Sequence, residues 1–174
     1  ILGKILPDGQ LLSLDVDARQ LPRTEQRLRD LGFSEQELLV KRSNYAGLAG
    51  ALQQIGWDDG VDFVLADLGL SSMQIDNPER GFSYKHDGPL DMRMNPERGV
   101  SAREWLVRCK PQKLQRWLEE AGDEPRSETI AAAIAGASTT GQGGLETTRQ
   151  LRQVIERALP DNCDDDLRKS TVTR

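Results

Sequence analysis

The chain has 174 residues, 37% of them hydrophobic and 29% charged, which is typical of one soluble globular domain. No apolar stretch approaches the roughly 18 residues of a membrane-spanning helix, so the composition excludes a protein anchored by such helices. The formal net charge is −5. Residues 1–100 contain 11 Lys and Arg against 16 Asp and Glu, and residues 101–174 contain 12 of each kind. Neither part therefore has the excess of basic residues that is typical of nucleic-acid binders.

Residues 1–68 alternate short apolar runs with amphipathic segments. The sequence predicts strands over 11–17, 37–41 and 61–68, and helices over 23–31 and 46–55. The run VDFVLADL at 61–68 is almost unbroken in apolar character, as expected for a parallel strand covered on both faces. Strands and helices that alternate at this spacing predict an α/β doubly wound fold.

From residue 69 to 99 the regular pattern gives way to glycine, proline and charge. The pentapeptide Asn-Pro-Glu-Arg-Gly occurs twice, at 77–81 and 95–99. Each copy predicts a single helical turn with Asn as the cap, Pro in the first turn and Gly as the stop. The loop FSYKHDGPLDMRM between them is long for a compact domain, and its aromatic and methionine content argues against plain disorder.

Residues 101–174 are predicted to be helical. Ser101 and Glu104 form a capping-box pattern, and three apolar stripes at helical spacing follow. The stripes are Leu114, Trp117, Leu118 and Ala121; Ile130, Ala133, Ile134 and Ala137; and Leu151, Val154, Ile155, Ala158 and Leu159. We expect the stripes to form a helical core, with a soft linker at 136–144.

Polar side chains follow the predicted strands, at the carboxyl edge where open parallel sheets bind ligands. Asp15 closes the first strand, where carboxylates commonly hydrogen-bond the ribose of a nucleotide. Tyr45 follows the second strand, where its ring could lie against an adenine. Asp67 and Gln74 belong to the cluster DLGLSSMQID that follows the third. Structural alternatives remain open, since Asp15 can start a loop and Tyr45 can be a core aromatic.

The stretch DLGLSSMQID, followed by ERGFSYKHDGPLDMRMNP, closely resembles the signature of the MraW-like family. These enzymes use S-adenosylmethionine to methylate N4 of a cytosine in bacterial small-subunit (16S) ribosomal RNA. The resemblance covers the whole chain, from ILGKILPDGQ to TVTR. It implies a partial Rossmann-like class I methyltransferase sheet, in residues 1–100, and an inserted all-helical substrate-recognition domain, in residues 101–174. The family's glycine-rich first motif and its C-terminal part have no counterpart here, so we expect a piece of such an enzyme.

Residue by residue, the resemblance implies that Asp15 contacts the cofactor ribose and that Tyr45, where the family often has Phe, lies beside the adenine. Asp67 and Gln74 match further positions that contact S-adenosylmethionine. The implied partner is small-subunit ribosomal RNA, within the assembled small subunit, and neither a metal nor a membrane is implied. The acidic run Asp164–Asp166 departs from the family, which tends to be basic there.

Methyl transfer to cytosine N4 needs positioning, because the lone pair of the amine is delocalised into the ring. Good geometry can lower such a barrier by on the order of 7 kcal/mol. The candidates that would position the base are Ser71, Ser72, Asp91 and Arg93, with Phe82 and Tyr84 as stacking surfaces. The alternative for Phe82, Met92 and Met94 is that they anchor the loop against the sheet, and we expect His86 to be an exposed loop residue.

Two other functions remain open. One is a non-catalytic nucleotide-binding or interaction module, or an inactive fragment of the enzyme, which the missing glycine-rich loop favours. The other is a different α/β enzyme with a nucleotide cofactor, which the DLGLSSMQ-to-DMRM signature disfavours. The widely spaced Cys109 and Cys163 and the lack of a visible signal peptide predict a reduced, cytoplasmic protein. His86, the single histidine, is too little for a Cys/His metal site.

Overall fold

The computed structural model describes residues 1–139 and 144–173, which form two compact units, Ile1–Asp67 and Leu68–Arg174. Within these described ranges, no helix combines the length and the apolar character needed to cross a membrane.

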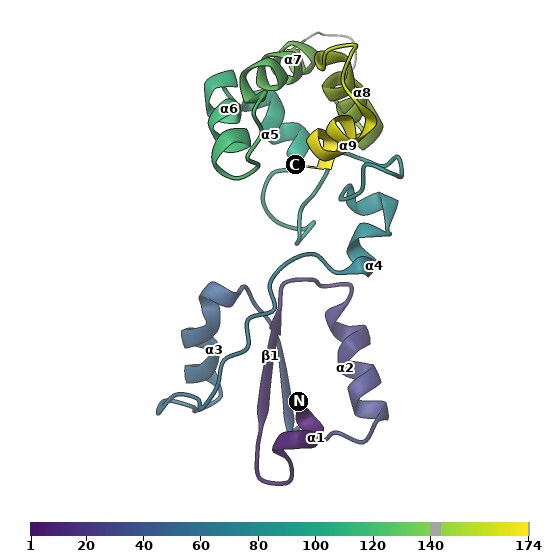
Figure 1. The fold of residues 1–174 in the computed structure, drawn as a ribbon. Helices are drawn as coiled ribbons and strands as arrows, with labels where there is room; N and C mark the ends of the chain where they lie inside the picture. Colours follow the sequence, from purple (N-terminus) through teal and green to yellow (C-terminus); the bar gives the residue numbers. More distant parts are fainter. Residues whose placement is uncertain (140–143, 174) are drawn as a thin grey trace. The chain divides into compact units, whose positions relative to one another are not determined.

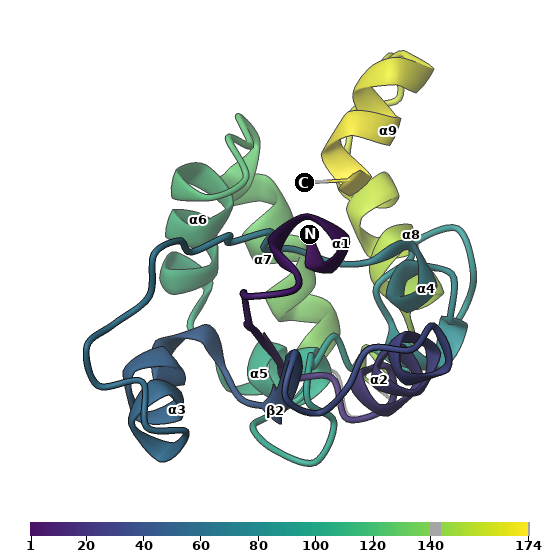
Figure 2. The same cartoon turned by 90° about the horizontal axis from the view of Figure 1, so that it is seen from below.

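The first unit is built on two parallel strands with helices on both sides. Its elements are α1 (Leu2–Ile5), β1 (Leu11–Asp15), α2 (Leu21–Asp30), β2 (Leu38–Arg42), the 3-10 turn η1 (Tyr45–Gly47) and α3 (Leu48–Gln54). The strands pair in register from Leu11 with Leu38 to Asp15 with Arg42. Helix α2 connects the strands and lies on the opposite side of them from α3 (Figures 1 and 2). The predicted α/β alternation is therefore confirmed for these elements.

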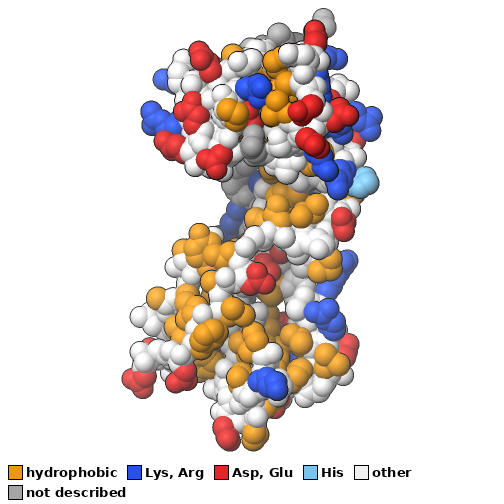
Figure 3. All heavy atoms as spheres, in the orientation of Figure 1, with side chains coloured by type: hydrophobic (Ala, Val, Ile, Leu, Met, Phe, Trp, Pro, Cys, Tyr) orange, Lys and Arg blue, Asp and Glu red, His pale blue; other side chains and the backbone are white. Residues whose placement is uncertain are grey.

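Segment 61–68 is the main departure from the predicted fold. It forms no strand, and its apolar side chains are exposed, with Phe63 at 78%. Figure 3 shows hydrophobic side chains gathered over this unit. A strand is stable only when its N–H and C=O groups find partners. In the described part of the chain, the sheet pairing is limited to β1 and β2. The prediction of a third strand here was wrong. The apolar pattern of a segment indicates that it could be buried, but a strand forms only when a neighbouring strand is there to pair with it.

The second unit combines a long loop with helices. Its elements are α4 (Ser72–Ile75), the 3-10 turn η2 (Pro78–Arg80), α5 (Ala102–Arg108), α6 (Pro111–Glu120), α7 (Ser127–Thr139), α8 (Thr148–Ala158) and α9 (Asp165–Thr173). Helix α7 packs against α5, α6 and α8, and α9 packs against α8 (Figure 1). The buried core contains Leu90, Leu114, Ile130, Ala131, Ile134 and Leu145.

The helical pattern predicted for this unit is largely confirmed. Ser101 and Glu104 form the expected capping box at the start of α5, and each apolar stripe supplies residues that lie in or against the core. The predicted linker at 136–144 is wrong at its beginning, because residues 136–139 continue α7; residues 140–143 lie outside the described residues. Helix α9 lies in the region predicted to be helical, but no individual helix was predicted over its residues.

The loop between α4 and α5 is fixed to the helices. The Leu90 N–H donates to the Glu146 carbonyl at 2.9 Å, and the Thr148 N–H donates to the Gly88 carbonyl at 3.0 Å. At its other end, the Ala102 N–H donates to the Asp91 carbonyl at 2.7 Å. This loop is therefore ordered as part of the second unit, although it contains no long helix or strand.

The two copies of the pentapeptide use the same turn chemistry to different extents. In the first, the Asn77 side chain accepts the Glu79 N–H at 3.0 Å, and the predicted helical turn forms as η2. In the second, the Asn95 side chain accepts the Glu97 N–H at 3.0 Å, but the segment forms a turn without a helix.

Candidate functional site

Asp15 and Tyr45 lie at the carboxyl edge of the two-stranded sheet. Asp15 ends β1, and its carbonyl oxygen accepts the Ser43 N–H at 2.9 Å, so the segment that leads to Tyr45 runs beside it. The Tyr45 side chain is 68% exposed, which rules out the alternative of a core aromatic in this unit. An exposed carboxylate and an exposed ring at one edge have the chemistry expected for ribose and adenine, and their role in binding stays a prediction.

Asp15 also stabilises the loop that leads to α2. Its Oδ1 accepts the Asp17 N–H at 2.8 Å. The fully buried Asp17 in turn accepts the N–H groups of Arg19 and Gln20 at 2.9 and 3.2 Å. Sequence reasoning did not single out Asp17, although a second carboxylate two residues after the strand end was a usable signal for a turn.

The polar cluster DLGLSSMQID folds in part as α4. The Ser71 hydroxyl accepts the Gln74 N–H at 3.3 Å, and the Gln74 side-chain oxygen accepts the Ser71 N–H at 2.9 Å. This capping box accounts structurally for Ser71 and for the buried Gln74. The Ser72 side chain and Asp67, which ends the first unit, are both exposed. Ligand contacts by these four residues stay predictions.

Asp91 and Arg93 are brought together by the loop. The Arg93 Nε and Nη2 groups donate to Asp91 Oδ1 and Oδ2 at 2.8 and 2.7 Å, and the Arg93 N–H donates to Oδ1 at 3.0 Å. The hydrogen bonds from the Arg93 side chain are the main reason why the pKa of the Asp91 carboxyl lies below its ordinary value. Asp91 is therefore an ionised carboxylate that can accept hydrogen bonds. A phosphate bound by Arg93 would share the Arg93 guanidinium with Asp91.

Arg80 holds the far side of this loop, and sequence reasoning missed it. Its side chain is buried, and its Nη2 donates to the carbonyl oxygens of Arg93 and Met94 at 3.3 and 2.9 Å. Its guanidinium carbon also lies 5.5 Å from the centre of the Phe82 ring. Met92, between the two paired residues, has a left-handed backbone with φ +60°. The loop thus places Asp91, Met92 and Arg93 in a defined conformation.

A groove with a volume of about 450 Å³ runs through the second unit. Its lining comes from the loop and from helices α5 to α9 and is mostly apolar, with four aromatic side chains, Phe82, Tyr84, Trp105 and Trp117. The two tryptophan rings stack with their centres 4.6 Å apart, and the Lys113 ammonium lies 5.3 Å from the centre of the Trp117 ring.

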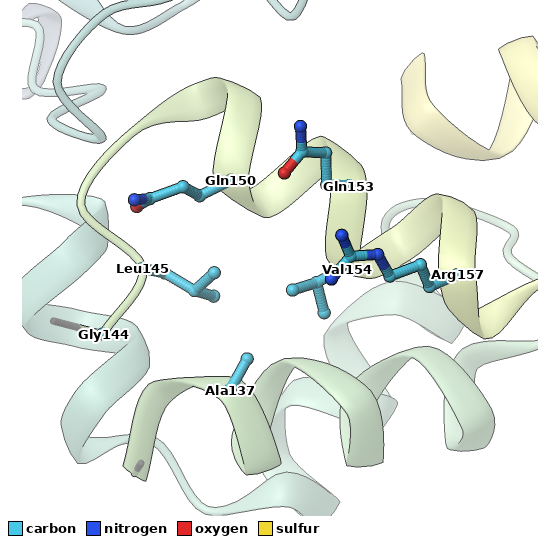
Figure 4. A pocket seen from close by; sticks show the side chains of 7 residues that line it. All are labelled: Ala137, Gly144, Leu145, Gln150, Gln153, Val154 and Arg157. Atoms are coloured by element: carbon cyan, nitrogen blue, oxygen red, sulfur yellow. The ribbon is translucent and has the colours of Figure 1, made fainter. Parts of the chain in front are cut away.

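A smaller pocket of about 190 Å³ lies between α7 and α8 (Figure 4). Ala137, Leu145 and Val154 point toward one another across it. Gln150, at its edge, uses its side-chain oxygen to accept the N–H groups of Glu146 and Thr147 at 2.7 and 3.1 Å. The seven residues that line this pocket include no carboxylate, thiol or imidazole, so it offers little chemistry.

Comparison with known proteins identifies the family. A model described as the MraW methylase family matches residues 1–171. The chain belongs to the MraW methylase family. This membership confirms the resemblance that was stated from two motifs. The first, DLGLSSMQID, spans residues 67–76, and the second, DGPLDMRM, lies in the loop before α5.

Curated relatives are similar along most of the chain. One is ribosomal RNA small subunit methyltransferase H 2 of Alkaliphilus metalliredigens (strain QYMF), 45% identical over 98% of this chain and 49% of that protein. Another is ribosomal RNA small subunit methyltransferase H 1 of Lachnoclostridium phytofermentans (strain ATCC 700394 / DSM 18823 / ISDg), 44% identical over 95% of this chain and 45% of that protein. The chain therefore spans about half the length of the curated relatives it matches.

Proposed function

We propose that this chain forms part of an S-adenosylmethionine-dependent methyltransferase that methylates N4 of a cytosine in small-subunit ribosomal RNA. The observation that carries the proposal is the match to the MraW methylase family over residues 1–171, together with relatives named ribosomal RNA small subunit methyltransferase H 2 and H 1 at 45% and 44% identity. Action on the assembled small subunit, in the cytoplasm, belongs to the same proposal.

The finer fold is also part of this proposal. The parallel pair β1 and β2, with α2 and α3 on opposite sides, supports a partial Rossmann-like class I methyltransferase sheet within residues 1–100. The helices α5 to α9 support a helical substrate-recognition insert in residues 101–174.

The residues at the sheet edge fit the proposed cofactor. Asp15 would accept hydrogen bonds from the ribose hydroxyls, and the exposed ring of Tyr45 would lie against the adenine. Asp67 and the segment around Gln74 would complete the contacts. When bound, S-adenosylmethionine supplies the methyl group on a positively charged sulfur.

The residues of the second unit would position the base. The ionised Asp91 carboxylate can accept hydrogen bonds from the N–H groups of the cytosine amine, which favours a more tetrahedral nitrogen with an available lone pair. The Ser71 and Ser72 hydroxyls offer further acceptors, although Ser71 is already engaged as the cap of α4. Arg93 would contact a phosphate of the RNA while Asp91 holds its guanidinium in place.

Calorimetric titration with S-adenosylmethionine tests the cofactor assignment. The protein is the complete gene product that contains these residues, with Asp15→Asn as the variant, because Asn can still accept the Asp17 N–H. Loss of a hydrogen bond to a charged group, about 1.5–3 kcal/mol, predicts binding about 10- to 150-fold weaker. Asp8→Asn, in an exposed turn of the same unit, is the matched control and should bind as the wild type does.

The titration also separates the alternatives. A wild-type protein that does not bind S-adenosylmethionine would overturn the proposal in favour of a non-catalytic interaction module or an inactive fragment. Binding that Asp15→Asn leaves unchanged would overturn the role of this carboxylate.

A further inference from the structure

Asp17 lies two residues after the end of β1 and is buried in the first unit. Its exposed fraction is 0%, which is rare for a carboxyl side chain, because a polar group taken out of water costs free energy unless it is hydrogen-bonded. Its Oδ1 accepts the N–H groups of Arg19 and Gln20 at 2.9 and 3.2 Å, and its carbonyl oxygen accepts the Leu21 N–H at 3.0 Å. The Asp17 side chain therefore holds the turn that leads from β1 into α2 (Figure 1).

The same turn fixes the orientation of the Asp15 carboxylate. The Asp17 N–H donates to Asp15 Oδ1 at 2.8 Å. The Asp15 main chain is fixed as well, because its carbonyl oxygen accepts the Ser43 N–H at 2.9 Å. Asp15 is exposed, and a carboxylate has about four acceptor positions, of which the Asp17 N–H takes one. Acceptor positions therefore remain for a pair of neighbouring hydroxyl groups.

We propose that Asp17 is a positioning residue for the cofactor, because its buried side chain fixes the N–H group that holds the Asp15 carboxylate ready for the ribose hydroxyls. The inference rests on the proposed function for its ligand. A carboxylate on a freely rotating side chain would lose that freedom on binding, whereas one held in place beforehand avoids the cost, so the ligand binds more tightly. The alternative is that Asp17 only stabilises the start of α2.

Calorimetric titration of the complete gene product with S-adenosylmethionine tests the proposal in a double-mutant cycle. We expect Asp17→Ala to weaken binding at least about fivefold in the wild-type background, because the Asp15 carboxylate loses its fixed orientation. In an Asp15→Ala background the same substitution should weaken binding less than about twofold, because no carboxylate is left to orient. A residue that only stabilises the fold would give the same loss in both backgrounds.

Two further variants separate positioning from stability. Asp17→Asn keeps a side-chain oxygen that can accept the same two N–H groups, so it should bind S-adenosylmethionine more tightly than Asp17→Ala does. Leu38→Val removes a buried methylene group, and Leu38 pairs with Leu11 at the opposite end of β1 from Asp15. This control should lower the urea midpoint and yet bind the cofactor as the wild type does.

Amide hydrogen exchange of the wild type gives a test that needs no substitution. We expect the N–H groups of Asp17, Arg19 and Gln20 to be protected from exchange before S-adenosylmethionine is added, because the turn is already formed. Protection that arises only after the cofactor binds would show that the cofactor orders the turn, and it would overturn the inference.

The outcomes also separate this inference from the proposed function. If the wild type binds S-adenosylmethionine and Asp15→Ala weakens binding while Asp17→Ala does not, the positioning role is overturned and the proposed function stands. Equal losses for Asp17→Ala in both backgrounds overturn the positioning role in the same way. If the wild type does not bind S-adenosylmethionine, the proposed function fails, and the inference fails with it.

Discussion

Replacing Gly81 by alanine tests how the second unit holds its loop. Gly81 and Gly99 close the two copies of the same pentapeptide, and both have a left-handed backbone, with φ +69° and +81°. Their surroundings differ. A Cβ atom at Gly81 would overlap the Pro89 carbonyl oxygen and come within 2.9 Å of the Asp91 nitrogen, whereas a Cβ atom at Gly99 would meet nothing within 4 Å. Gly99→Ala is therefore a matched control.

The difference between the two variants can be estimated from these contacts. Both substitutions place a side chain in the left-handed region, which costs about 1–2 kcal/mol. Only Gly81→Ala also forces backbone atoms apart, and overpacking of this kind typically costs about 1–3 kcal/mol more. We therefore expect the free energy of unfolding to fall by roughly 2–5 kcal/mol for Gly81→Ala and roughly 1–2 kcal/mol for Gly99→Ala.

Urea denaturation followed by tryptophan fluorescence measures this difference. A Trp57→Phe background leaves Trp105 and Trp117, which both belong to the second unit, as the reporters. With a slope of about 1–3 kcal/mol per molar urea, the midpoint of Gly81→Ala should lie clearly below that of Gly99→Ala. Equal midpoints for the two variants would refute the steric reasoning. They would show that only the cost of placing a side chain in the left-handed region, which both variants share, matters.

Three further predictions concern polar groups of the second unit. The pKa of Asp91 is lowered in the folded chain, so its ion pair stabilises the fold above about pH 4, and this contribution is lost as the pH falls through the lowered value. The urea midpoint of Asp91→Asn should therefore change less between pH 7 and pH 3 than that of the wild type. Identical changes would count against a stabilising ion pair. Ser71→Ala should weaken α4 by about 0.5–2 kcal/mol and speed amide exchange at Gln74, whereas Ser72→Ala, outside the cap, should leave that exchange unchanged. Arg80→Met should lower the free energy of unfolding by about 1.5–3 kcal/mol, because two loop carbonyls lose a charged donor, and a urea midpoint equal to that of the wild type would contradict this role.

The first unit shows which parts of the fold are visible in the sequence. The bounds of β1, α2, β2 and α3 lie within two residues of the predicted ones, because hydrophobic period and helix-ending residues are local signals. Segment 61–68 carries an equally strong local pattern, but a strand also needs a neighbour, and no local pattern reports whether one is present. Helix α9 was not predicted as an individual helix for the opposite reason, since DDLRKSTVT contains little apolar periodicity.

The candidate site shows a similar division. The placement of Asp15 and Tyr45 at one sheet edge could be predicted, because it follows from the order of strands and polar residues. The exposure of Tyr45 was left open by the sequence and is given by the structure. The Ser71–Gln74 capping box was also readable, as a serine followed three residues later by glutamine, but the polar cluster was interpreted only as a ligand site. The burial of Arg80 and the left-handed Met92 could not be predicted, because both depend on contacts between residues distant in the sequence.

The identity of the methylated product tests the proposed function most directly. Small ribosomal subunits that lack the modification are incubated with the complete gene product and S-adenosylmethionine labelled on its methyl group, and the RNA is digested to nucleosides for mass spectrometry. We predict label in N4-methylcytidine from the small-subunit RNA, reduced at least about tenfold by Asp15→Asn at limiting cofactor. Label on another nucleoside, or no label in the RNA although S-adenosylmethionine binds, would contradict it.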